Sequence, residues 1–202
     1  MVQASENIDL SKPSLDSETS IEKMLAERRS IRDYPDTALQ LAEIGQLLWA
    51  AQGITHPQGF RTAPSAGALY PLELFVVAGR VEDLAKGIYH YNSKHHQLVK
   101  TSDDDVRSAL AQAAMSQAWV KDNAAVIVFA ADYDRTTRKY GKRGIRYVHM
   151  EVGHAAENLF LQSGSLGLAT VVVGAFNDAK VARILQLPSK LEPLLLMPIG
   201  RK

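Results

Sequence analysis

The sequence predicts one α+β domain, a sandwich with a mixed central sheet flanked by helices. Apolar runs typical of strands and apolar stripes of helical spacing follow one another without strict alternation, which argues against a Rossmann domain. The length of 202 residues suits a single domain, and no repeat, linker or low-complexity tract divides it. We therefore expect an extended arm over residues 1–17 and one domain over residues 18–202.

The N-terminal part of this domain carries two helix signals and one loop signal. Residues 19–22 have capping-box spacing, which predicts a helix that runs to about Arg28. Residues 37–40 repeat that spacing before an amphipathic stripe, and Gly53 suits the end of the second helix. Residues 54–71 are punctuated by proline and glycine, so we expect a long loop there.

The remaining elements follow from the period of the apolar residues. Buried strands are expected at residues 72–78, 124–130, 169–173 and 194–199. A hairpin is expected from residues 87–92 and 97–100, with its turn near Asn92-Ser93-Lys94. Helices are expected at residues 106–119, 146–161 and 180–187, and the second of these has the longest apolar stripe.

Composition and charge exclude several classes of function. Lysine and arginine total 23 against 22 acidic residues, which gives no electrostatic argument for nucleic acid or an anionic membrane. The absence of cysteine excludes disulfides, iron–sulfur clusters, thiolate zinc sites and cysteine nucleophiles. No secretory signal pattern and no apolar run of about 20 residues occurs. We therefore expect a cytoplasmic protein with neither nucleic acid nor membrane as its partner.

Arginines cluster where the first predicted helix ends. The segment Arg28-Arg29-Ser30-Ile31-Arg32 offers three guanidiniums and a hydroxyl within five residues. Arginine recognises phosphate through paired, charge-assisted hydrogen bonds, so an anion site is one interpretation. The alternative is a set of solvated cations that complement the dipole at a helix C-terminus.

A loop of small residues precedes the first predicted strand of the sheet. The segment Pro64-Ser65-Ala66-Gly67-Ala68-Leu69-Tyr70-Pro71 would let backbone amides approach a flat ligand closely. An ordinary turn between two prolines explains the same residues. The sequence alone leaves these two interpretations even.

Two further basic segments have a structural and a functional interpretation. Residues 138–146 form a charge run that we expect to be a solvated loop, or else the rim of a pocket in which Tyr140 stacks on a planar substrate. The C-terminal Pro198-Ile199-Gly200-Arg201 is either an ordinary chain end or the source of a further phosphate ligand, Arg201.

Other sites are set aside on their patterns. Glu151 and His154 have the Glu-x-x-His spacing of di-iron bundles, but no second copy of the motif exists, and we expect no metal. His149 and His154 lie on different faces of the predicted helix. The sequence contains no dinucleotide-binding glycine fingerprint, no Walker A motif and no nucleophile elbow.

Taken together and in order, these segments resemble the nitroreductase family, and most closely the branch that includes the azoline-forming (thiazole/oxazole) dehydrogenases. The resemblance spans roughly residues 20–201 and is carried by the ordered set of residues 20–32, 64–71, 140–147, 151–154, 164–176 and 198–201. It implies an α+β nitroreductase-like sandwich that forms a homodimer through long helices and binds FMN at the subunit interface. No single motif would carry that implication alone.

The resemblance also implies a role for each cofactor-binding residue. Arg28, Arg29 and Ser30 would surround the phosphate and ribityl chain, with Arg201 closing on the phosphate. Arg32 would approach the pyrimidine edge, where a guanidinium stabilises the negative charge of the reduced flavin. Pro64, Ser65, Ala66, Gly67 and Ala68 would come from the partner subunit, and Val172, Val173 and Gly174 would lie near the reactive N5.

The implied enzyme is an FMN-dependent oxidoreductase without a catalytic side chain, because the flavin N5 carries the chemistry. It would transfer hydride from NADH or NADPH to FMN and then to a small acceptor, such as a nitroaromatic or quinone, with Tyr70 and Tyr140 at the substrate. Many nitroreductases carry asparagine where this chain has Gly67-Ala68, which leaves the acceptor open. The alternatives are an azoline-type dehydrogenase of a modified peptide and a non-catalytic flavin-binding protein.

Overall fold

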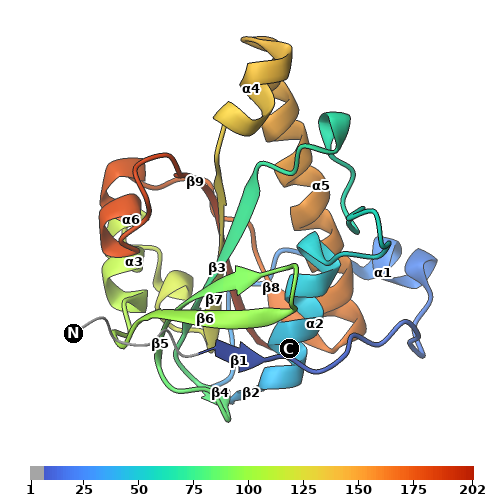
Figure 1. Cartoon of the computed structure of the whole chain (residues 1–202). Coiled ribbons are helices and arrows are strands. Elements are labelled where there is room, and N and C mark those ends of the chain that lie inside the picture. Colours follow the sequence, from blue (N-terminus) through green and yellow to red (C-terminus); the bar gives the residue numbers. More distant parts are fainter. Residues whose placement is uncertain (1–6) are drawn as a thin grey trace.

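A computed structural model describes residues 7–202, which form a seven-stranded sheet covered by helices on both faces (Figure 1). The strand order is β1-β6-β5-β3-β7-β9-β8, and every neighbouring pair is antiparallel. The strands are β1 (Asn7–Asp9), β3 (Leu72–Ala78), β5 (Gly87–Asn92), β6 (Gln97–Ser102), β7 (Ala125–Ala131), β8 (Leu168–Thr170) and β9 (Glu192–Arg201). A separate parallel pair joins β2 (Leu39–Gln40) to β4 (Val81–Glu82). The predicted α+β class is confirmed, with its antiparallel and parallel pairs in separate sheets.

Alternating side chains of the central strands pack into two separate cores, one on each face of the sheet. On β3, Leu74 and Val76 pack into one cluster, whereas Phe75 and Val77 pack into another. This is the period of two expected for a strand that is buried on both faces. The sheet is therefore the middle layer of a sandwich.

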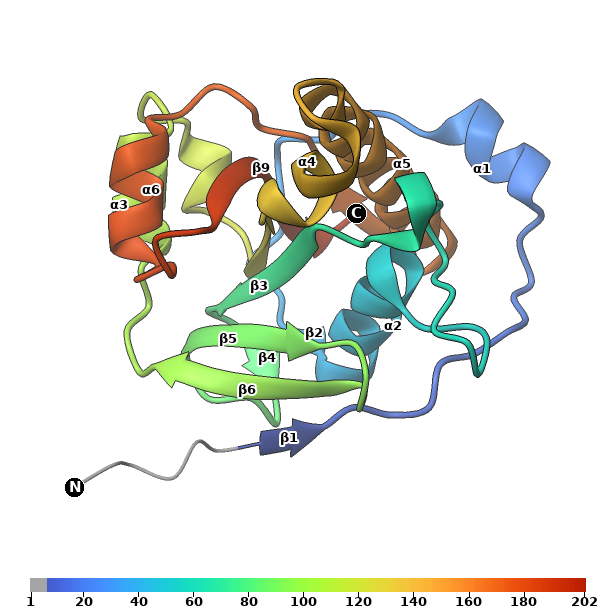
Figure 2. The same cartoon turned by 45° about the horizontal axis from the view of Figure 1, so that its top comes forward.

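The helices divide between these two layers. Residues of α2 (Leu41–Gln52) and α5 (Arg143–Ser165) join the first core, and residues of α3 (Arg107–Ala113) and α6 (Asp178–Ile184) join the second. Two peripheral helices, α1 (Ile21–Glu27) and α4 (Asp134–Tyr140), pack mainly on α5. The 3₁₀ turns are η1 (Ala66–Ala68) and η2 (Ala118–Val120). Figure 2 shows α5 as the central helix, with α1, α2 and α4 around it.

The charged run at residues 138–146 is helical, so the expected loop is wrong. Helix α4 covers its first residues, and α5 already begins at Arg143. Tight turns end α4 and begin α5: the N–H of Gly141 donates to Thr137 O at 2.7 Å and that of Gly144 to Gly141 O at 2.9 Å. The charges lie on exposed helix surface, where charge content does not oppose helix formation.

Two other predicted elements are too long. The helix expected over residues 106–119 ends at Ala113, because Met115 and Ser116 have φ angles of 56° and 57°, which a helix does not accommodate. The strand expected over residues 169–173 ends at Thr170, and Val173 makes only an isolated bridge to Leu196. Apolar content predicted burial in both segments but not where the backbone turns.

The N-terminal arm consists of β1 and an extended segment that contacts α2. Its β1 pairs with β6, and the N–H of Leu10 donates to His96 O at 3.1 Å. Farther along, Gln46 of α2 bonds both the N–H and the carbonyl of Ser14, at 2.9 and 3.0 Å. The part of the predicted arm that precedes Asn7 lies outside the described residues.

Among the described residues, no helix combines the length and apolarity that would be needed to cross a bilayer.

Candidate functional site

The Arg28–Arg32 segment is anchored at the end of α1. Ser20 caps the start of that helix by accepting from the Lys23 N–H at 3.2 Å, one residue later than the predicted capping position. Met24 is the buried residue of α1, and it packs over Gly164 of α5, where a Cβ would come within 2.7 Å of the Met24 sulfur. The Met24 side chain thus holds α1 against α5 shortly before the arginines begin.

Two of the three guanidiniums of this segment have no carboxylate partner among residues 7–202. Arg28 lies 5.1 Å above the ring of Phe160 and 4.0 Å from the Glu157 carboxylate. Arg29 donates to backbone carbonyls of α1, and Arg32 lies 5.5 Å from the ring of Trp119. Within residues 7–202, neither Arg29 nor Arg32 forms an ion pair with a carboxylate. This is the arrangement expected of a phosphate site rather than of an internal charge network.

The structure brings Val172, Val173 and Gly174 to the same edge of the sheet. The N–H of Ile31 donates to Thr170 O at 3.0 Å, which ties the arginine segment to the end of β8. Val173 exchanges two backbone hydrogen bonds with Leu196, whereas Val172 is 36% exposed and faces outward. The two predicted sets of flavin contacts therefore lie side by side within one chain.

The fourth predicted arginine occupies the same edge but is engaged by an acid. Arg201 ends β9 opposite Leu168, and its guanidinium donates to Glu43 of α2 at 2.5 and 3.0 Å. Glu43 also accepts from the Gln40 N–H at 2.8 Å and so caps the start of α2. The next residue, Lys202, lines a small cavity with Arg28 and Arg29, but Arg201 itself would have to leave Glu43 before it could bind a phosphate.

The small-residue loop has an unusual backbone. Gly67, Ala68 and Tyr70 have φ angles of 64°, 54° and 46°, values that residues other than glycine rarely adopt. Ser65 stabilises the turn because its carbonyl accepts from the Ala68 N–H at 3.0 Å and its hydroxyl from the Tyr70 N–H at 2.9 Å. Strained backbone of this kind clusters at functional sites, which favours the binding interpretation over an ordinary turn.

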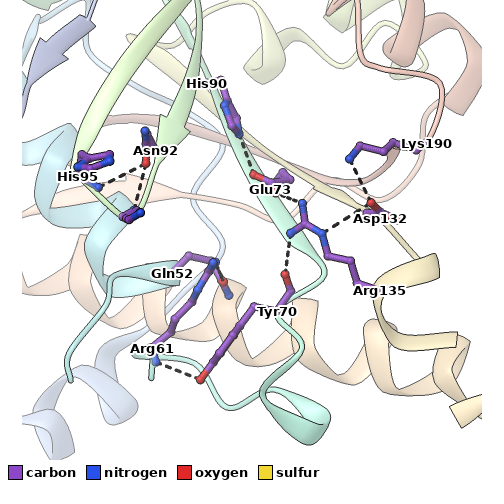
Figure 3. A network of polar contacts seen from close by, with 11 residues as sticks. Gln52, Arg61, Tyr70, Glu73, His90, Asn92, His95, Asp132, Arg135 and Lys190 are labelled. Atoms are coloured by element: carbon purple, nitrogen blue, oxygen red, sulfur yellow. Dashed lines mark hydrogen bonds and ion pairs between the residues drawn. The ribbon is translucent and has the colours of Figure 1, made fainter. Parts of the chain in front are cut away.

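A network of charged side chains secures the end of this loop (Figure 3). Arg135 of α4 donates to the Tyr70 carbonyl at 2.9 Å and to Glu73 of β3 at 2.5 Å. His90 of β5 contacts the other Glu73 oxygen at 2.8 Å. Burial would raise the pKa of Glu73, but the hydrogen bonds from His90 and Arg135 outweigh that effect and lower it. Glu73 is thus an ionised anchor at neutral pH.

Arg61 closes the other side of the loop. Its Nη1 donates to Gln52 at 2.8 Å, its N–H donates to the Tyr70 hydroxyl at 3.3 Å, and its guanidinium lies 4.7 Å from the Tyr70 ring (Figure 3). Burial lowers the pKa of Arg61, and the nearby Glu73 opposes the shift. The Tyr70 ring is thereby held in place rather than projecting freely toward a substrate.

The second predicted substrate residue, Tyr140, lies at the exposed side of the same loop. A Cβ added to Gly67 would come within 2.7 Å of the Tyr140 hydroxyl and 3.0 Å of Lys139 Nζ. The Tyr140 ring also meets Tyr147 of α5 edge-on, with centroids 5.2 Å apart. The tip of α4 and the loop therefore form one surface.

The two halves of the predicted site lie on different sides of α5. In Figure 2 the stretch that follows α1 passes behind α5, whereas η1 lies in front of it. One chain therefore does not bring Arg28–Arg32 and Pro64–Ala68 together around one ligand. That the loop serves the site of a second subunit stays a prediction.

Glu151 of α5 is a buried acid that faces the small-residue loop. It is 2% exposed, and its Oε1 has no hydrogen-bond partner among the described residues. Burial raises the pKa of Glu151 to about 7, although Ser65 and Arg61 oppose the shift. The neighbouring His149 bonds to the Tyr133 hydroxyl at 2.6 Å, and no group of metal-ligating side chains occurs in the part of the chain described here.

Comparison with known proteins identifies the class. The Nitroreductase family matches residues 25–201, so the chain belongs to that family. A Methanocaldococcus jannaschii protein that carries the name "putative nitroreductase" is 48% identical over 92% of both chains. The crystal structure of a protein of the same description from Ralstonia eutropha has a TM-score of 0.84 at 30% identity, and covers 96% of this chain and 89% of that one.

Two more distant relatives have more specific names. The microcin B17-processing protein McbC of Escherichia coli is 28% identical over 80% of this chain and 62% of its own length, which supports the placement near the azoline-forming branch. The FMN reductase [NAD(P)H] of Bacillus subtilis is 22% identical over 88% of this chain and 64% of its own length. The chain is therefore an oxidoreductase of the nitroreductase family, and one of its relatives is named as an FMN reductase.

Several residues of the site were missed at the sequence level. Glu73 interrupts an otherwise apolar strand, and Glu151 interrupts the apolar stripe of a long helix. An acidic residue at such a buried position indicates that a cationic or hydrogen-bonding side chain lies beside it. Their partners Arg61 and Arg135 come from other parts of the chain, so no local pattern pairs them. In the sequence, Glu43 is only a polar residue near the start of a predicted helix, and nothing there indicates its ion pair with Arg201.

Proposed function

We propose that this protein is an FMN-dependent oxidoreductase that takes electrons from NADH or NADPH and passes them to a small acceptor such as a nitroaromatic or a quinone. The observation that carries the proposal is the placement of Arg28–Arg32 beside the exposed Val172 and Gly174 at one edge of the sheet. Arg29 and Arg32, which have no acidic partner among the described residues, suit a phosphate, and the open space at Gly174 suits the edge of a ring system. FMN would supply the two-electron chemistry.

The chain's own residues would bind and orient the cofactor. Arg28, Arg29 and Ser30 would hold the phosphate and ribityl chain, and Arg201 would join them on release from Glu43. Arg32 would place positive charge beside the pyrimidine edge and so favour the reduced form. A Cβ added to Gly174 would meet no atom closer than 3.9 Å, so the space around this glycine leaves room for a ring edge.

We propose that a second copy of the chain completes the site. A groove of about 1030 Å³ opens between residues 11–21 of one chain and the helices α2 and α5. Leu15, Ile21 and Leu25 are 82%, 60% and 57% exposed on the arm and α1 that border it. Exposed apolar side chains gathered around a groove favour burial by a partner. A homodimer would cover them and deliver Pro64–Ala68 to the opposite Arg28–Arg32 segment.

The proposal is tested on the purified protein. We expect it to be yellow, to release one FMN per subunit on denaturation, to sediment as a dimer, and to oxidise NADH or NADPH when a quinone or nitroaromatic is added. Colourless protein that cannot be reconstituted with FMN would contradict the cofactor. Bound FMN without turnover by any donor would instead favour a non-catalytic flavin-binding role.

The similarity to McbC favours a second candidate, a dehydrogenase that acts on an azoline ring in a modified peptide. In that case the peptide would be the electron donor and would lose two hydrogens. Mass spectrometry of a thiazoline or oxazoline peptide incubated with the protein separates the two candidates, because an NAD(P)H-dependent reductase leaves its mass unchanged.

A further inference from the structure

The side chain of Arg32 lies against an indole ring rather than against an acid. Its Cζ is 5.5 Å from the centre of the Trp119 ring, which is within the range of a cation–π contact. Within residues 7–202, no carboxylate pairs with this guanidinium. A carboxylate would neutralise the charge and occupy N–H donors, whereas contact with a ring face leaves both available for a ligand. The charge of Arg32 is therefore held in place but not cancelled.

The backbone that carries Arg32 is fixed by contacts of its neighbours. The N–H of Ile31 donates to Thr170 O at 3.0 Å, and the carbonyl of Ile31 accepts from the Tyr34 hydroxyl at 2.8 Å. Tyr34 packs so closely on Gly200 that a Cβ added to this glycine would come within 2.6 Å of it. These contacts join the segment to β8 and β9 and determine where the Arg32 side chain begins. Its long, flexible stem needs a further contact to fix where the guanidinium lies.

The turn before η2 brings the indole ring to this edge of the sheet. Met115 and Ser116 have φ angles of 56° and 57°, a left-handed backbone that is unfavourable for both residue types. The Gln117 side chain donates to Ala175 O at 3.1 Å, so η2 is tied to the residue that follows Gly174. This short segment therefore contacts the arginine segment through the indole ring and the end of the 172–175 stretch through the Gln117 amide.

Packing rather than hydrogen bonding orients the Trp119 ring. The ring is partly buried and packs on the second core, and its Nε1 has no hydrogen-bond partner among the described residues. The backbone at this position is held by Asn123, whose Nδ2 donates to the Trp119 carbonyl at 2.9 Å. Phenylalanine could therefore replace the indole without loss of a hydrogen bond, whereas leucine would fill part of the space but offer no aromatic face.

We propose that Trp119 is a positioning residue whose indole ring orients the Arg32 guanidinium toward the pyrimidine edge of the bound flavin. The inference rests on the proposed function, in which that edge gains negative charge on reduction. Trp119 acts only through Arg32: it keeps the cation near the ring edge and reduces the conformational freedom that the side chain would lose on binding. Loss of the indole ring should therefore weaken the effect of Arg32 on the flavin while the arginine itself remains.

A double-mutant cycle in the cofactor-free protein tests the contact without depending on flavin. Urea unfolding is measured for the unmodified chain, Trp119→Leu, Arg32→Gln and the double variant. We expect the two substitutions to depart from additivity by a factor of about three in the unfolding equilibrium constant, because each removes the same cation–π contact. Additive effects would overturn the proposal. The same cycle with Trp49→Leu, whose ring packs against Gly53, is the matched control and should be additive.

A measurement on the intact Trp119 decides the question even if Trp119→Leu fails to fold. The chain contains two tryptophans, so Trp49→Phe leaves Trp119 as the only source of indole emission. Arg32 is exposed, so Arg32→Gln leaves the core untouched and removes the charge over the ring. We expect this substitution to shift the emission maximum, and Arg29→Gln to leave it unchanged, since Arg29 donates to backbone carbonyls at the end of α1. An unchanged emission maximum in Arg32→Gln would overturn the proposal.

The flavin-bound protein tests the consequence of the contact. The midpoint potential of bound FMN should fall in Trp119→Leu and be largely retained in Trp119→Phe, and Trp119→Leu should cause no further fall when Arg32→Ala is already present. Spectroelectrochemical titration measures these potentials. A potential in Trp119→Leu equal to that of the unmodified chain would overturn the positioning role. Absence of FMN binding in the unmodified chain would contradict the proposed function, while the cycle and the emission measurement would still decide whether Trp119 holds Arg32.

Discussion

Arg201 and Glu43 form a two-point ion pair, with Nη1 to Oε1 at 2.5 Å and Nη2 to Oε2 at 3.0 Å. The pair joins the last strand to the start of α2. The same guanidinium is a proposed phosphate ligand, so Glu43 and a bound phosphate would compete for it.

Replacing Glu43 should reveal that competition. Glu43→Gln removes the charge but keeps an acceptor for the Gln40 N–H, so we expect a loss of about 1 kcal/mol in the free energy of unfolding. FMN affinity should increase several-fold, because Arg201 becomes available. Urea unfolding and flavin fluorescence titration measure the two effects. A lower or unchanged affinity would mean that Arg201 does not bind the phosphate.

Arg32 should govern the flavin more than it governs the fold. We expect Arg32→Ala to weaken FMN binding about tenfold. The midpoint potential of the bound flavin should fall, because positive charge beside the reduced ring is lost. Spectroelectrochemical titration measures the potential, and Arg183→Ala on the exposed side of α6 is the matched control. Equal affinity and potential in both variants would show that Arg32 does not lie beside the flavin.

Gly67 should tolerate a side chain less well than Gly59. Both glycines have positive φ, 64° and 85°, but a Cβ on Gly67 would meet Tyr140 and Lys139 whereas nothing lies within 4 Å at Gly59. Each substitution to alanine should cost about 1 kcal/mol of stability through backbone strain. Only Gly67→Ala should also weaken FMN binding, since the added methyl group displaces the Tyr140 side chain. Equal FMN affinities of the two variants would show that the contact between Gly67 and Tyr140 is not part of the FMN site.

Glu73 should stabilise the fold at neutral pH and lose that effect in acid. Its pKa is lowered in the folded state by His90 and Arg135, so the stabilisation is present above the ordinary value of 4.5 and disappears as the pH falls through the lower folded value. Glu73→Gln should cost about 1–3 kcal/mol at pH 7 and little at pH 3. Thermal unfolding across that range measures it, and a cost that is the same at both pH values would argue against the network.

Glu151 should show the opposite trend. Its pKa is raised to about 7, so its favourable contribution is complete below the ordinary value of 4.5 and is lost as the pH rises toward 7. The unmodified chain should therefore lose about 1–3 kcal/mol relative to Glu151→Gln between pH 4.5 and pH 7.5. Parallel stability curves for the two proteins would refute the burial of a protonated carboxyl group.

Local patterns in the sequence were sufficient to predict the strands and helices whose residues are mostly buried in the core. Residues 72–78 form a strand over the predicted range, and the predicted hairpin occurs at residues 87–92 and 97–102, because continuous apolar runs and turn residues leave few alternatives. The incorrect predictions fall where the polarity of the side chains does not indicate the backbone conformation. Residues 138–146 are charged and yet helical, and residues 114–116 are apolar in part and yet turn.

The candidate site was predictable only as far as its motifs are continuous in sequence. Arg28–Arg32 and Pro64–Pro71 could each be read as segments, and the resemblance assigned them to one cofactor. The contacts that organise them are long-range: Arg135 to Tyr70 and Glu43 to Arg201. Such pairs depend on the packing of α4, α2 and α5, which no local pattern encodes.

The central claim is that FMN lies in a site shared between two chains, and complementation tests it most directly. Arg29→Glu/Arg32→Glu damages the phosphate side, and Ala66→Trp blocks the loop side, so neither homodimer should bind FMN. When the two variants are unfolded together and refolded as an equal mixture, half of the dimers are mixed, and each mixed dimer contains one intact shared site. We predict FMN in about one quarter of all sites, whereas a site built within one chain would leave the mixture without FMN.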